Sequence, residues 1–398
     1  MNRPKIIADD KIPFLKGALE NYADIVYLPG AKTTAADVKD ADVIFTRTRT
    51  KCDEKLLGGS HVKLIATATI GYDHIDTEYC DKMGIRWVNA PGCNSYSVQQ
   101  YITAALATLV YERGLKFRDL TIGIIGVGNV GSKVMKAAEA LGIRVLLNDP
   151  PKELAYNGLD CFVPRNDERY IETPFGERKV VSLDKLLTES DIVTCHVPLT
   201  KEEPYMTFHL ANDGFFAKMK DNAVFINSSR GAVTDTEALR KAINSGKLSA
   251  FILDVWETEP TPDPELLAKA FISTPHIAGY SSDGKANGTA ACIREFANYF
   301  NINELKNWYP SEIPSPPMPL TIAINGAGKS KEQIIYEAVT HTYPITEDSN
   351  RLKISPEAFE KQRGDYWIRR EFKNFTIEAK NIDPQTAQSL ELLGFTIK

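Results

Sequence analysis

Three polar residues in the second half of the chain carry the side chains that oxidation of a hydroxy acid requires. Arg230 follows the run NAVFINSS, Glu259 lies in DVWETEP, and His276 lies in STPHIAGY. The reaction needs a base for the hydroxyl proton, a cation for the carboxylate and the developing carbonyl oxygen, and a hydride acceptor. A guanidinium holds carboxylate and carbonyl oxygens together. A neighbouring carboxylate favours a protonated imidazole, so we predict that Glu259 supports His276 as the acid and base.

Each of these residues also has an ordinary structural interpretation when it is taken alone. Arg230 could be a surface charge, Glu259 an acid at a helix start, and His276 a hydrogen-bonded loop histidine. Catalysis is favoured because all three follow strand patterns of an expected open α/β sheet, where ligands bind beyond the strand ends. The other histidines lack this setting and receive no role. No metal site is expected, because the cysteines form no C-x-x-C pair.

A hydride acceptor is indicated by residues 121–131, TIGIIGVGNVG. Here G-x-G-x-x-G lies between an apolar strand pattern and a helix pattern that starts near Asn129, which is the context of a dinucleotide-binding turn. The first glycine permits a tight turn, the second admits the pyrophosphate, and the third lets the helix pack on the strand. The residues of this loop that we predict to bind the cofactor are Gly126, Gly128, Asn129, Val130 and Gly131.

Asp149 selects the cofactor. It ends the next strand pattern, RVLLND, at about the separation of 20 residues expected for the acid that binds the adenosine ribose. A carboxylate there accepts hydrogen bonds from the ribose hydroxyls and repels a 2′-phosphate. The sequence therefore predicts NAD rather than NADP.

Two series of strand patterns must position these residues. The first hundred residues contain KIIAD, ADVIFTRT, HVKLIATAT and IRWVN, separated by helical stretches. From residue 120 onward the patterns are TIGIIG, RVLLND, DIVTCH, NAVFIN, LSAFILD and FIST, each apolar enough for a sheet covered on both faces. This alternation predicts an α/β protein with two doubly wound parallel sheets. The expected helices include residues 97–114, a helix capped by Thr234 and Glu237, and residues 283–300.

The proline-rich stretch NWYPSEIPSPPMPL is expected to be a linker. It precedes about ninety residues with their own strand patterns, LTIAI, FTIEA and GFTIK, which predict a third, small α+β domain. The net charge of −5 gives no basic surface for nucleic acid, and no apolar stretch approaches the length of a membrane span. We therefore expect a cytoplasmic protein with neither nucleic-acid nor membrane partners.

At the motifs GVGNVG, NSSRG, DVWETEP and PHIAG the sequence resembles the D-isomer-specific 2-hydroxyacid dehydrogenases. The resemblance implies a Rossmann NAD domain, residues 99–280, and a flavodoxin-like substrate domain made of residues 1–98 and 281–305. It also implies further NAD contacts, from Val197, Ser228, Ser229, Arg230, Asp254 and Gly279.

Within that family the chain is most similar to members that act on a small phosphorylated hydroxy acid. The similarity rests on RTRTKCDEKLL, ATATIGYDHID, APGCNS and HIAGY, and it implies substrate contacts from Thr48, Thr69 and Tyr280. Arg47 and Lys51 are expected to share one face of a strand end and to attract the phosphate. Residues 151–180 look longer than the family pattern and are expected to form a surface excursion. FEKQRGDYWIRREF resembles a dimerisation domain, which implies a homodimer formed by residues 306–398.

Two alternatives remain open at this point. Another member of the family, such as a phosphoglycerate or glyoxylate dehydrogenase, would carry the same three catalytic residues. A nucleotide-sensing binding protein, like the corepressors related to this family, would use the same scaffold to recruit partners. Capture of a partner in an NAD-dependent way without turnover would favour the sensor.

Overall fold

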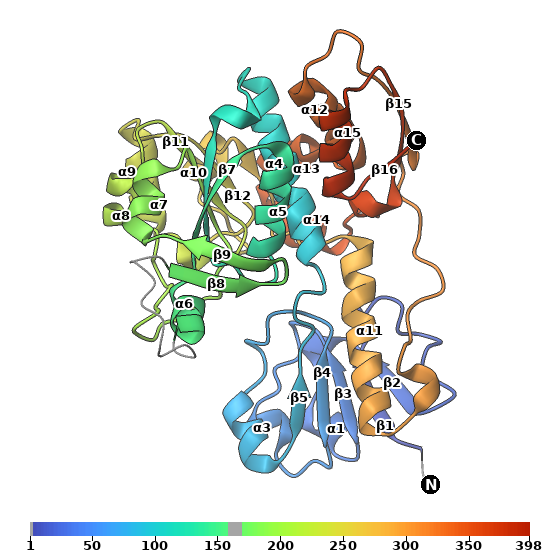
Figure 1. Cartoon of the computed structure of the whole chain (residues 1–398). Helices are drawn as coiled ribbons and strands as arrows, with labels where there is room; N and C mark the ends of the chain where they lie inside the picture. The colour runs from blue at the N-terminus through green and yellow to red at the C-terminus, as the bar shows by residue number, and fades with distance from the viewer. Residues whose placement is uncertain (1–2, 158–168) are drawn as a thin grey trace. The chain divides into compact units, whose positions relative to one another are not determined.

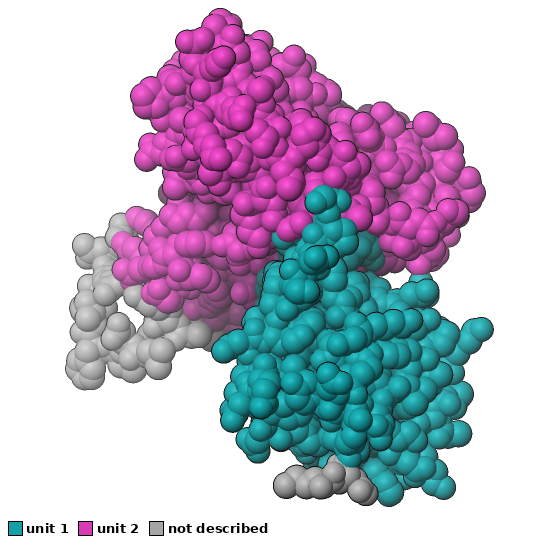
Figure 2. Space-filling view, turned by 90° about the vertical axis from the view of Figure 1, so that its right-hand side faces the viewer, with its two compact units in different colours: residues 1–94, 280–315 teal, residues 95–279, 316–398 magenta. Residues whose placement is uncertain are grey.

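The computed structural model describes residues 3–157 and 169–398 of the chain. These residues form two compact units, shown in two colours in Figure 2. Unit 1 contains residues 1–94 and 280–315, and unit 2 contains residues 95–279 and 316–398. No helix among the described residues has the length and apolar character needed to cross a bilayer. The five cysteines in the described ranges are free thiols.

Unit 1 is built on a five-stranded parallel sheet with the order β2-β1-β3-β4-β5. The strands are β1 (Lys5–Asp9), β2 (Asp24–Leu28), β3 (Val43–Thr46), β4 (Leu64–Thr67) and β5 (Arg86–Val88). This is the strand order of flavodoxin-like sheets, as predicted. β2, an edge strand that is only partly buried, was not predicted from the sequence.

Helices cover both faces of this sheet because successive residues of a strand point to opposite sides. Ile6 and Phe45 pack with α11 (Ser282–Tyr299), whereas Ile7 and Ile44 belong to a second cluster on the opposite face. The helices of that second face are α1 (Ala35–Val38), α2 (Glu54–Leu57) and α3 (Thr77–Met83). Figure 1 shows α11 lying along the strands. Unit 1 is therefore completed by residues that follow the first segment of unit 2, residues 95–279, in the sequence.

Unit 2 contains a six-stranded parallel sheet with the order β13-β12-β11-β10-β6-β7. Its strands are β6 (Thr121–Ile125), β7 (Arg144–Asn148), β10 (Ile192–Cys195), β11 (Ala223–Asn227), β12 (Leu248–Leu253) and β13 (Ile272–Ser273). All six coincide with the predicted strand patterns to within two residues at each end. The chain moves outward in one direction from β6 to β7 and in the other from β10 to β13, so the direction of winding reverses between β6 and β10.

Strand alternation again divides the core of this sheet into two faces. Ile124 and Ile226 pack against α4 (Ser95–Glu112) and α5 (Gly131–Leu141), whereas Ile125 and Phe225 lie in the opposite cluster. The helices of the opposite face are α7 (Leu183–Glu189), α8 (Asp213–Lys218), α9 (Thr236–Asn244) and α10 (Pro264–Lys269). The sequence of α4 is apolar on nearly all sides, and the helix is correspondingly buried.

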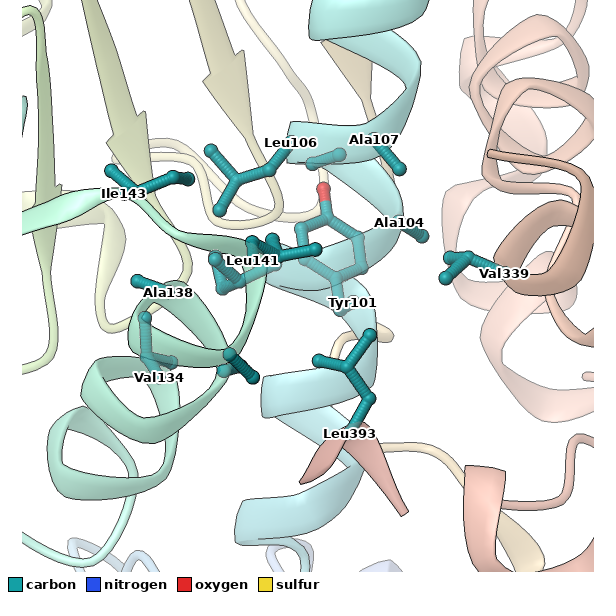
Figure 3. Packing of buried hydrophobic residues seen from close by; sticks show 14 of the residues in the cluster. Tyr101, Ala104, Leu106, Ala107, Val134, Ala138, Leu141, Ile143, Val339 and Leu393 are labelled. Atoms are coloured by element: carbon teal, nitrogen blue, oxygen red, sulfur yellow. The ribbon is translucent and has the colours of Figure 1, made fainter. Parts of the chain in front are cut away.

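The C-terminal segment, residues 316–398, packs on the other side of α4. It contains a parallel three-stranded sheet, β14 (Thr321–Asn325), β15 (Thr376–Lys380) and β16 (Thr396–Ile397). Its helices are α12 (Lys331–Thr342), α13 (Ile345–Ile354), α14 (Phe359–Gly364) and α15 (Pro384–Leu393). Figure 3 shows Ala104 of α4 facing Val339 of α12, and Tyr101 lying near Leu393. One hydrophobic cluster thus joins this segment to α4 and α5.

The predicted three-domain division, with a separate domain from residue 306, stays a prediction. In the structure, residues 316–398 belong to the same compact unit as the six-stranded sheet.

Two smaller expectations were wrong. The cap of α9 is Asp235, whose side chain accepts hydrogen bonds from the amides of Glu237 and Ala238, rather than Thr234. The expected surface excursion is only partly on the surface. Beyond α6 (Pro150–Asn157), residues 169–180 form the hairpin of β8 (Arg169–Thr173) and β9 (Gly176–Val180), which buries Ile171 in the main cluster of unit 2. Residues 158–168 of that stretch, with Cys161, lie outside the described residues.

Candidate active site

The candidate site lies at the edge of the six-stranded sheet where its parallel strands end. The predicted residues follow β6, β7, β10, β11, β12 and β13, and the carboxyl ends of parallel strands share one edge. Ligands of open α/β sheets bind at this edge, at the point where the direction of winding reverses. In this chain that point lies between β6 and β10, and the glycine loop follows β6.

The three glycines of this loop are required for different physical reasons. Gly126 has a φ of +85°, and a Cβ atom there would lie 2.5 Å from the carbonyl oxygen of His196. A Cβ atom on Gly131 would lie 1.9 Å from the carbonyl oxygen of Gly126, so this position allows α5 to approach the turn. A Cβ atom on Gly128 would meet no protein atom within 4 Å. The open space at Gly128 fits a pyrophosphate that approaches the backbone closely.

The helix after the loop begins slightly later than predicted. α5 begins at Gly131 with Val130 as its N-cap, and Asn129 is exposed before it. The first backbone amides of a helix have no partner within the helix, and they favour anionic groups such as phosphate. The described loop and helix therefore have the features that binding of a dinucleotide requires.

Asp149 is held beside the glycine loop. Its Oδ2 accepts a hydrogen bond of 2.8 Å from the amide of Val127, so the end of β7 is tied to the turn after β6. Lys152 donates from Nζ to the carbonyl oxygen of Val127, also at 2.8 Å. Lys152 was not predicted to have a role, and only its spacing after Asp149 in the sequence indicates one.

The other predicted cofactor residues lie in loops along the same edge. Val197 follows β10 and is partly buried. After β11, Ser229 donates from both its amide and its hydroxyl group to Asn227 Oδ1, at 2.9 and 2.8 Å. The hydroxyl of Ser228 is buried without a hydrogen-bond partner among the described residues. Gly279 lies in the loop after β13, at the last position of that segment of unit 2.

Arg230 is presented by a loop that Asn227 shapes. The Nδ2 group of Asn227 donates to the carbonyl oxygen of Arg230 at 2.9 Å and to Thr234 Oγ1 at 2.9 Å. The next residue must be glycine, because a Cβ atom on Gly231 would lie 2.0 Å from the carbonyl oxygen of Trp256. The loops after β11 and β12 therefore touch just beyond Arg230. Sequence reasoning assigned no role to Asn227, although its position in the N-x-x-R-G motif was visible.

Glu259 and His276 are in direct contact, with His276 Nδ1 lying 2.9 Å from Glu259 Oε2. The other carboxylate oxygen, Oε1, accepts a hydrogen bond of 2.9 Å from the amide of Trp256. Burial alone would raise the pKa of the Glu259 carboxyl group. The hydrogen bond and the charge of His276 act against burial, and the pKa of Glu259 lies below its usual value. Glu259 is thus anchored as a carboxylate, and the second ring nitrogen of His276, Nε2, has no hydrogen-bond partner among the described residues.

The backbone of His276 has an uncommon conformation, with a φ of +57°. Side chains with a Cβ atom adopt this region at a cost of about 1–3 kcal/mol, and such strain often marks functional sites. Asp254 stabilises the conformation: its carbonyl oxygen accepts from the His276 amide at 2.7 Å, and its carboxylate accepts from the amides of Ile277 and Ala278 at 2.8 and 2.9 Å. The Asp254 side chain is almost fully buried, so its contact with NAD stays a prediction.

Thr274 and Tyr101 extend this support into the core. Thr274 Oγ1 donates to Asp254 Oδ1 at 2.6 Å and lies 2.8 Å from the hydroxyl of Tyr101, on α4. Burial raises the pKa of the Asp254 carboxyl group, and its hydrogen bonds act in the opposite direction. No motif in the sequence indicated these two residues.

The predicted substrate residues lie in unit 1. Thr48 is exposed in a turn after β3, and Thr69 lies in the loop after β4, the neighbouring strand of the parallel sheet. The hydroxyl of Thr69 lies 2.7 Å from Thr67 Oγ1 and donates to the carbonyl oxygen of Gly71 at 2.8 Å. Tyr280 lies just before α11, and the Nζ atom of Lys285 is 5.1 Å from the centre of its ring.

The expectation that Arg47 and Lys51 share a strand face was wrong. β3 ends at Thr46, so the alternation of a strand does not continue through residues 47–51. Arg47 donates to the carbonyl oxygen of Lys11 at 3.1 Å, and Lys51 pairs with Asp53 at 3.3 Å.

Comparison with protein families identifies two parts of the chain. Residues 99–278 match the model of the D-isomer specific 2-hydroxyacid dehydrogenase, NAD binding domain. Residues 315–394 match a model described only as a domain of unknown function. The first match covers the six-stranded sheet, and the second covers most of the C-terminal segment.

Solved structures of similar fold include NAD-bound dehydrogenases. D-lactate dehydrogenase from Aquifex aeolicus, complexed with NAD and lactic acid, is 28% identical, with a TM-score of 0.59 over 78% of this chain and 100% of that one. An NAD-bound 3-phosphoglycerate dehydrogenase from Entamoeba histolytica is 25% identical, with a TM-score of 0.58 over 77% of this chain and 98% of that one. These matches agree with the parallel α/β fold and with NAD as the cofactor.

Curated relatives match nearly the whole chain. Erythronate-4-phosphate dehydrogenase from Bacteroides thetaiotaomicron is 49% identical over 94% of this chain and 99% of its own length. The enzyme of that name from Yersinia enterocolitica is 35% identical over 98% of this chain and 99% of its own length. The chain therefore belongs to the erythronate-4-phosphate dehydrogenase family, within the D-isomer specific 2-hydroxyacid dehydrogenases, and is an NAD-dependent dehydrogenase.

Proposed function

We propose that the chain oxidises 4-phospho-D-erythronate to 2-oxo-3-hydroxy-4-phosphobutanoate with NAD, a step in the synthesis of pyridoxal 5′-phosphate. The observation that carries the proposal is the contact between His276 and Glu259 at the edge of a nucleotide-binding sheet. Relatives named for this activity match the chain over nearly their full length, which supports the choice of substrate.

His276 acts as the base in oxidation. Its Nδ1 is engaged by Glu259, so Nε2 takes the proton of the C2 hydroxyl group. Glu259 is held as a carboxylate and stabilises the imidazolium that results. In the reverse direction the same imidazolium returns the proton to the carbonyl oxygen.

Arg230 binds the substrate carboxylate and stabilises the oxygen at C2 as it becomes a carbonyl. Its loop is held by Asn227 and by the close approach at Gly231, so the guanidinium extends from a fixed backbone. NAD supplies the hydride acceptor when it is bound at the glycine loop. Gly126, Gly128, Asn129, Val130 and Gly131 hold its pyrophosphate, and Asp149 holds its adenosine ribose.

Unit 1 supplies the substrate contacts in this proposal. The hydroxyl group of Thr48 donates to an anionic oxygen of the substrate, and that of Thr69 does so after it turns from the carbonyl oxygen of Gly71, to which it donates in this structure. The phenol of Tyr280 contributes a further polar group. We also propose that the protein is a cytoplasmic homodimer and that residues 306–398 form its dimer interface.

The test is NADH formation with a panel of D-2-hydroxy acids. The panel contains 4-phospho-D-erythronate, D-erythronate, 3-phospho-D-glycerate and D-glycerate, so phosphate and chain length vary separately. We expect kcat/KM for 4-phospho-D-erythronate to exceed that for the unphosphorylated acids by at least about 100-fold, since a site built for a charged group rejects analogues that lack it. It should exceed that for 3-phospho-D-glycerate by about 10-fold or more, because that acid keeps the phosphate but is one carbon shorter. A higher value for 3-phospho-D-glycerate would overturn the substrate assignment.

The catalytic assignment is tested with His276→Ala. We expect this variant to lose at least about 100-fold in kcat, because a positioned acid and base contributes that much or more, while the Kd for NADH changes little. Equal losses of turnover and NADH binding would contradict the assignment of His276. Capture of a partner protein without turnover on any acid would favour the sensor alternative.

A further inference from the structure

One of the largest buried side chains in unit 2 is a charged residue of the C-terminal segment. Arg369 lies after α14 and is 0% exposed. Burial of a guanidinium is costly unless its donors are satisfied and its charge is compensated. A residue retained in such a place therefore has contacts that an apolar side chain of similar size could not make.

The contacts of Arg369 lead to the loop that carries His276. Its Nη2 atom lies 3.2 Å from the carbonyl oxygen of Ile277, 2.5 Å from that of Ala278, and 2.8 Å from Ser97 Oγ on α4. These carbonyl groups belong to the two residues that directly follow His276. Nη2 shares its two N–H groups among these three oxygens, and the planar guanidinium leaves Nη1 to make a separate contact with Tyr366.

The remaining contacts of Arg369 fix the guanidinium itself. The group lies over the ring of Tyr343, 4.3 Å from its centre, and Nη1 donates to the hydroxyl of Tyr366 at 3.4 Å. Tyr366 in turn donates to Asp348 at 2.7 Å. All of these partners lie in the C-terminal segment, and the buried carboxylate of Asp348, which also pairs with Arg351 at 3.3 Å, compensates part of the charge.

The same two residues of the loop are held from their amide side by Asp254. Its carboxylate accepts from the amides of Ile277 and Ala278, while Arg369 donates to their carbonyl oxygens. An anion and a cation therefore bind the same short stretch of backbone. Such double anchoring is what a strained conformation requires, and His276, with its φ of +57°, comes immediately before this stretch.

Two further contacts connect the C-terminal segment to the catalytic loops. Ser349, on α13, accepts a hydrogen bond of 3.0 Å from the amide of Ser273, in the strand that leads to His276. The charge of Arg363, on α14, helps to lower the pKa of Glu259. The segment thus binds the strand before His276 and the backbone after it, and one of its charges acts on Glu259, the carboxylate partner of His276.

We propose that Arg369 is a positioning residue for the dehydrogenase reaction: it holds residues 276–278 so that the imidazole of His276 stays in its productive orientation on Glu259. The proposal rests on the proposed role of His276. The C-terminal segment, which matches a domain of unknown function, would then take a direct part in the active site of its own subunit.

The first test measures the loop without using activity. Hydrogen–deuterium exchange of the holoenzyme with NADH is compared for wild type, Arg369→Met, Arg369→Lys and the control Ile377→Val. Met has a similar volume without donors, Lys keeps the charge without the fork, and Ile377→Val removes one buried methylene from β15. We expect faster exchange in the peptide covering residues 274–280 for Arg369→Met, a smaller increase for Arg369→Lys, and none for Ile377→Val. Unchanged exchange in that peptide for Arg369→Met would overturn the proposal.

The second test is a double-mutant cycle on kcat. We expect Arg369→Met to lower kcat by about 10- to 100-fold, as a misplaced catalytic group does, with the Kd for NADH within about twofold. In a His276→Ala background the same substitution should have no further effect, because the group that it positions is absent. If the losses multiply in the double variant, Arg369 acts only on general stability and the proposal fails.

Turnover of His276→Ala tests the proposed function, and hydrogen–deuterium exchange of the Arg369 variants tests this inference. If His276→Ala keeps full turnover, the catalytic role of His276 is wrong, whereas the exchange experiment still reports whether Arg369 holds the loop.

Should Arg369→Met fail to fold, Tyr366→Phe is used in both tests. This variant removes the hydroxyl that fixes Nη1 and leaves the guanidinium in place, and it should show the same pattern at smaller size. Absence of that pattern would count against the proposal.

Discussion

A methyl group added to the glycine loop should weaken cofactor binding without impairing folding. Gly128 has no positive φ, and a Cβ atom there would meet no protein atom within 4 Å. Gly128→Ala should therefore fold normally, and it should stabilise the chain by about 0.4–1 kcal/mol because the unfolded state loses conformational freedom. The added methyl would occupy the space in which we place the pyrophosphate of NAD.

The expected loss of affinity follows from the contacts at stake. A hydrogen bond to a charged group contributes about 1.5–3 kcal/mol. Loss of one such contact raises the Kd about 10- to 150-fold. Titration calorimetry with NADH measures this change, and thermal unfolding without cofactor measures stability. Gly128→Ala should weaken NADH binding within that range while the unfolding midpoint stays level or rises slightly, because the substitution stabilises the chain.

Gly131→Ala is the matched control. Its Cβ atom would lie 1.9 Å from the carbonyl oxygen of Gly126, so the turn or α5 must move. Overpacking of this kind costs about 1–3 kcal/mol, and the unfolding midpoint should fall by several degrees. If Gly128→Ala binds NADH as tightly as the wild type, the pyrophosphate does not lie at this loop and the reasoning is wrong.

Three further changes have defined outcomes. The pKa of Glu259 is lower in the folded chain than its usual 4.5, so its stabilising contribution is lost as the pH falls from 4.5 through the folded value. The stability difference between wild type and Glu259→Gln, measured by denaturant unfolding, should therefore shrink as the pH falls below 4.5. A difference that grows over that range would contradict the sign. Asp149→Asn should narrow the preference for NAD over NADP by about fivefold, since about 1 kcal/mol of charge repulsion disappears, and kcat/KM with each cofactor measures it. Ile354 and Leu392 are exposed apolar residues of the C-terminal segment, 80% and 65% exposed, so replacing both with Glu should convert the proposed dimer to a monomer in light scattering. A dimer that persists in this variant would place the interface elsewhere.

Much of the fold follows from patterns that are local in the sequence. The six strands of unit 2 were predicted because each is a short apolar run bounded by turn residues, and β6 with its glycines defines a motif of fixed spacing. β2 was missed because its burial alternates only weakly, as is common for an edge strand. The cap of α9 was placed one residue early because Thr234 and Asp235 are both good capping residues, and only backbone geometry decides between them.

The supports of the site could not be predicted in the same way. Glu259 and His276 were predicted to pair because a carboxylate favours a protonated imidazole and because the two residues follow adjacent strands. The residues that hold them, Asp254, Thr274 and Arg369, come from separate parts of the chain and meet only after folding. Arg369 lies in the run RREF, and three consecutive charged residues normally indicate an exposed segment. Its burial depends on partners such as Tyr343 and the carbonyl groups after His276, which no local pattern reveals.

The edge of the six-stranded sheet has a consequence for how the chain is made. β13 is an outermost strand, and the amide of Ser273 finds its acceptor in Ser349, while the carbonyl of Ala270 is bound by Lys353. Both Ser349 and Lys353 emerge from the ribosome late, after most of the sheet has been synthesised. Until then this border is open to pairing with strands of other nascent chains. Slow translation or premature termination between Ser273 and Ser349 should therefore yield aggregates, and a chaperone that shields strand edges would act in this interval.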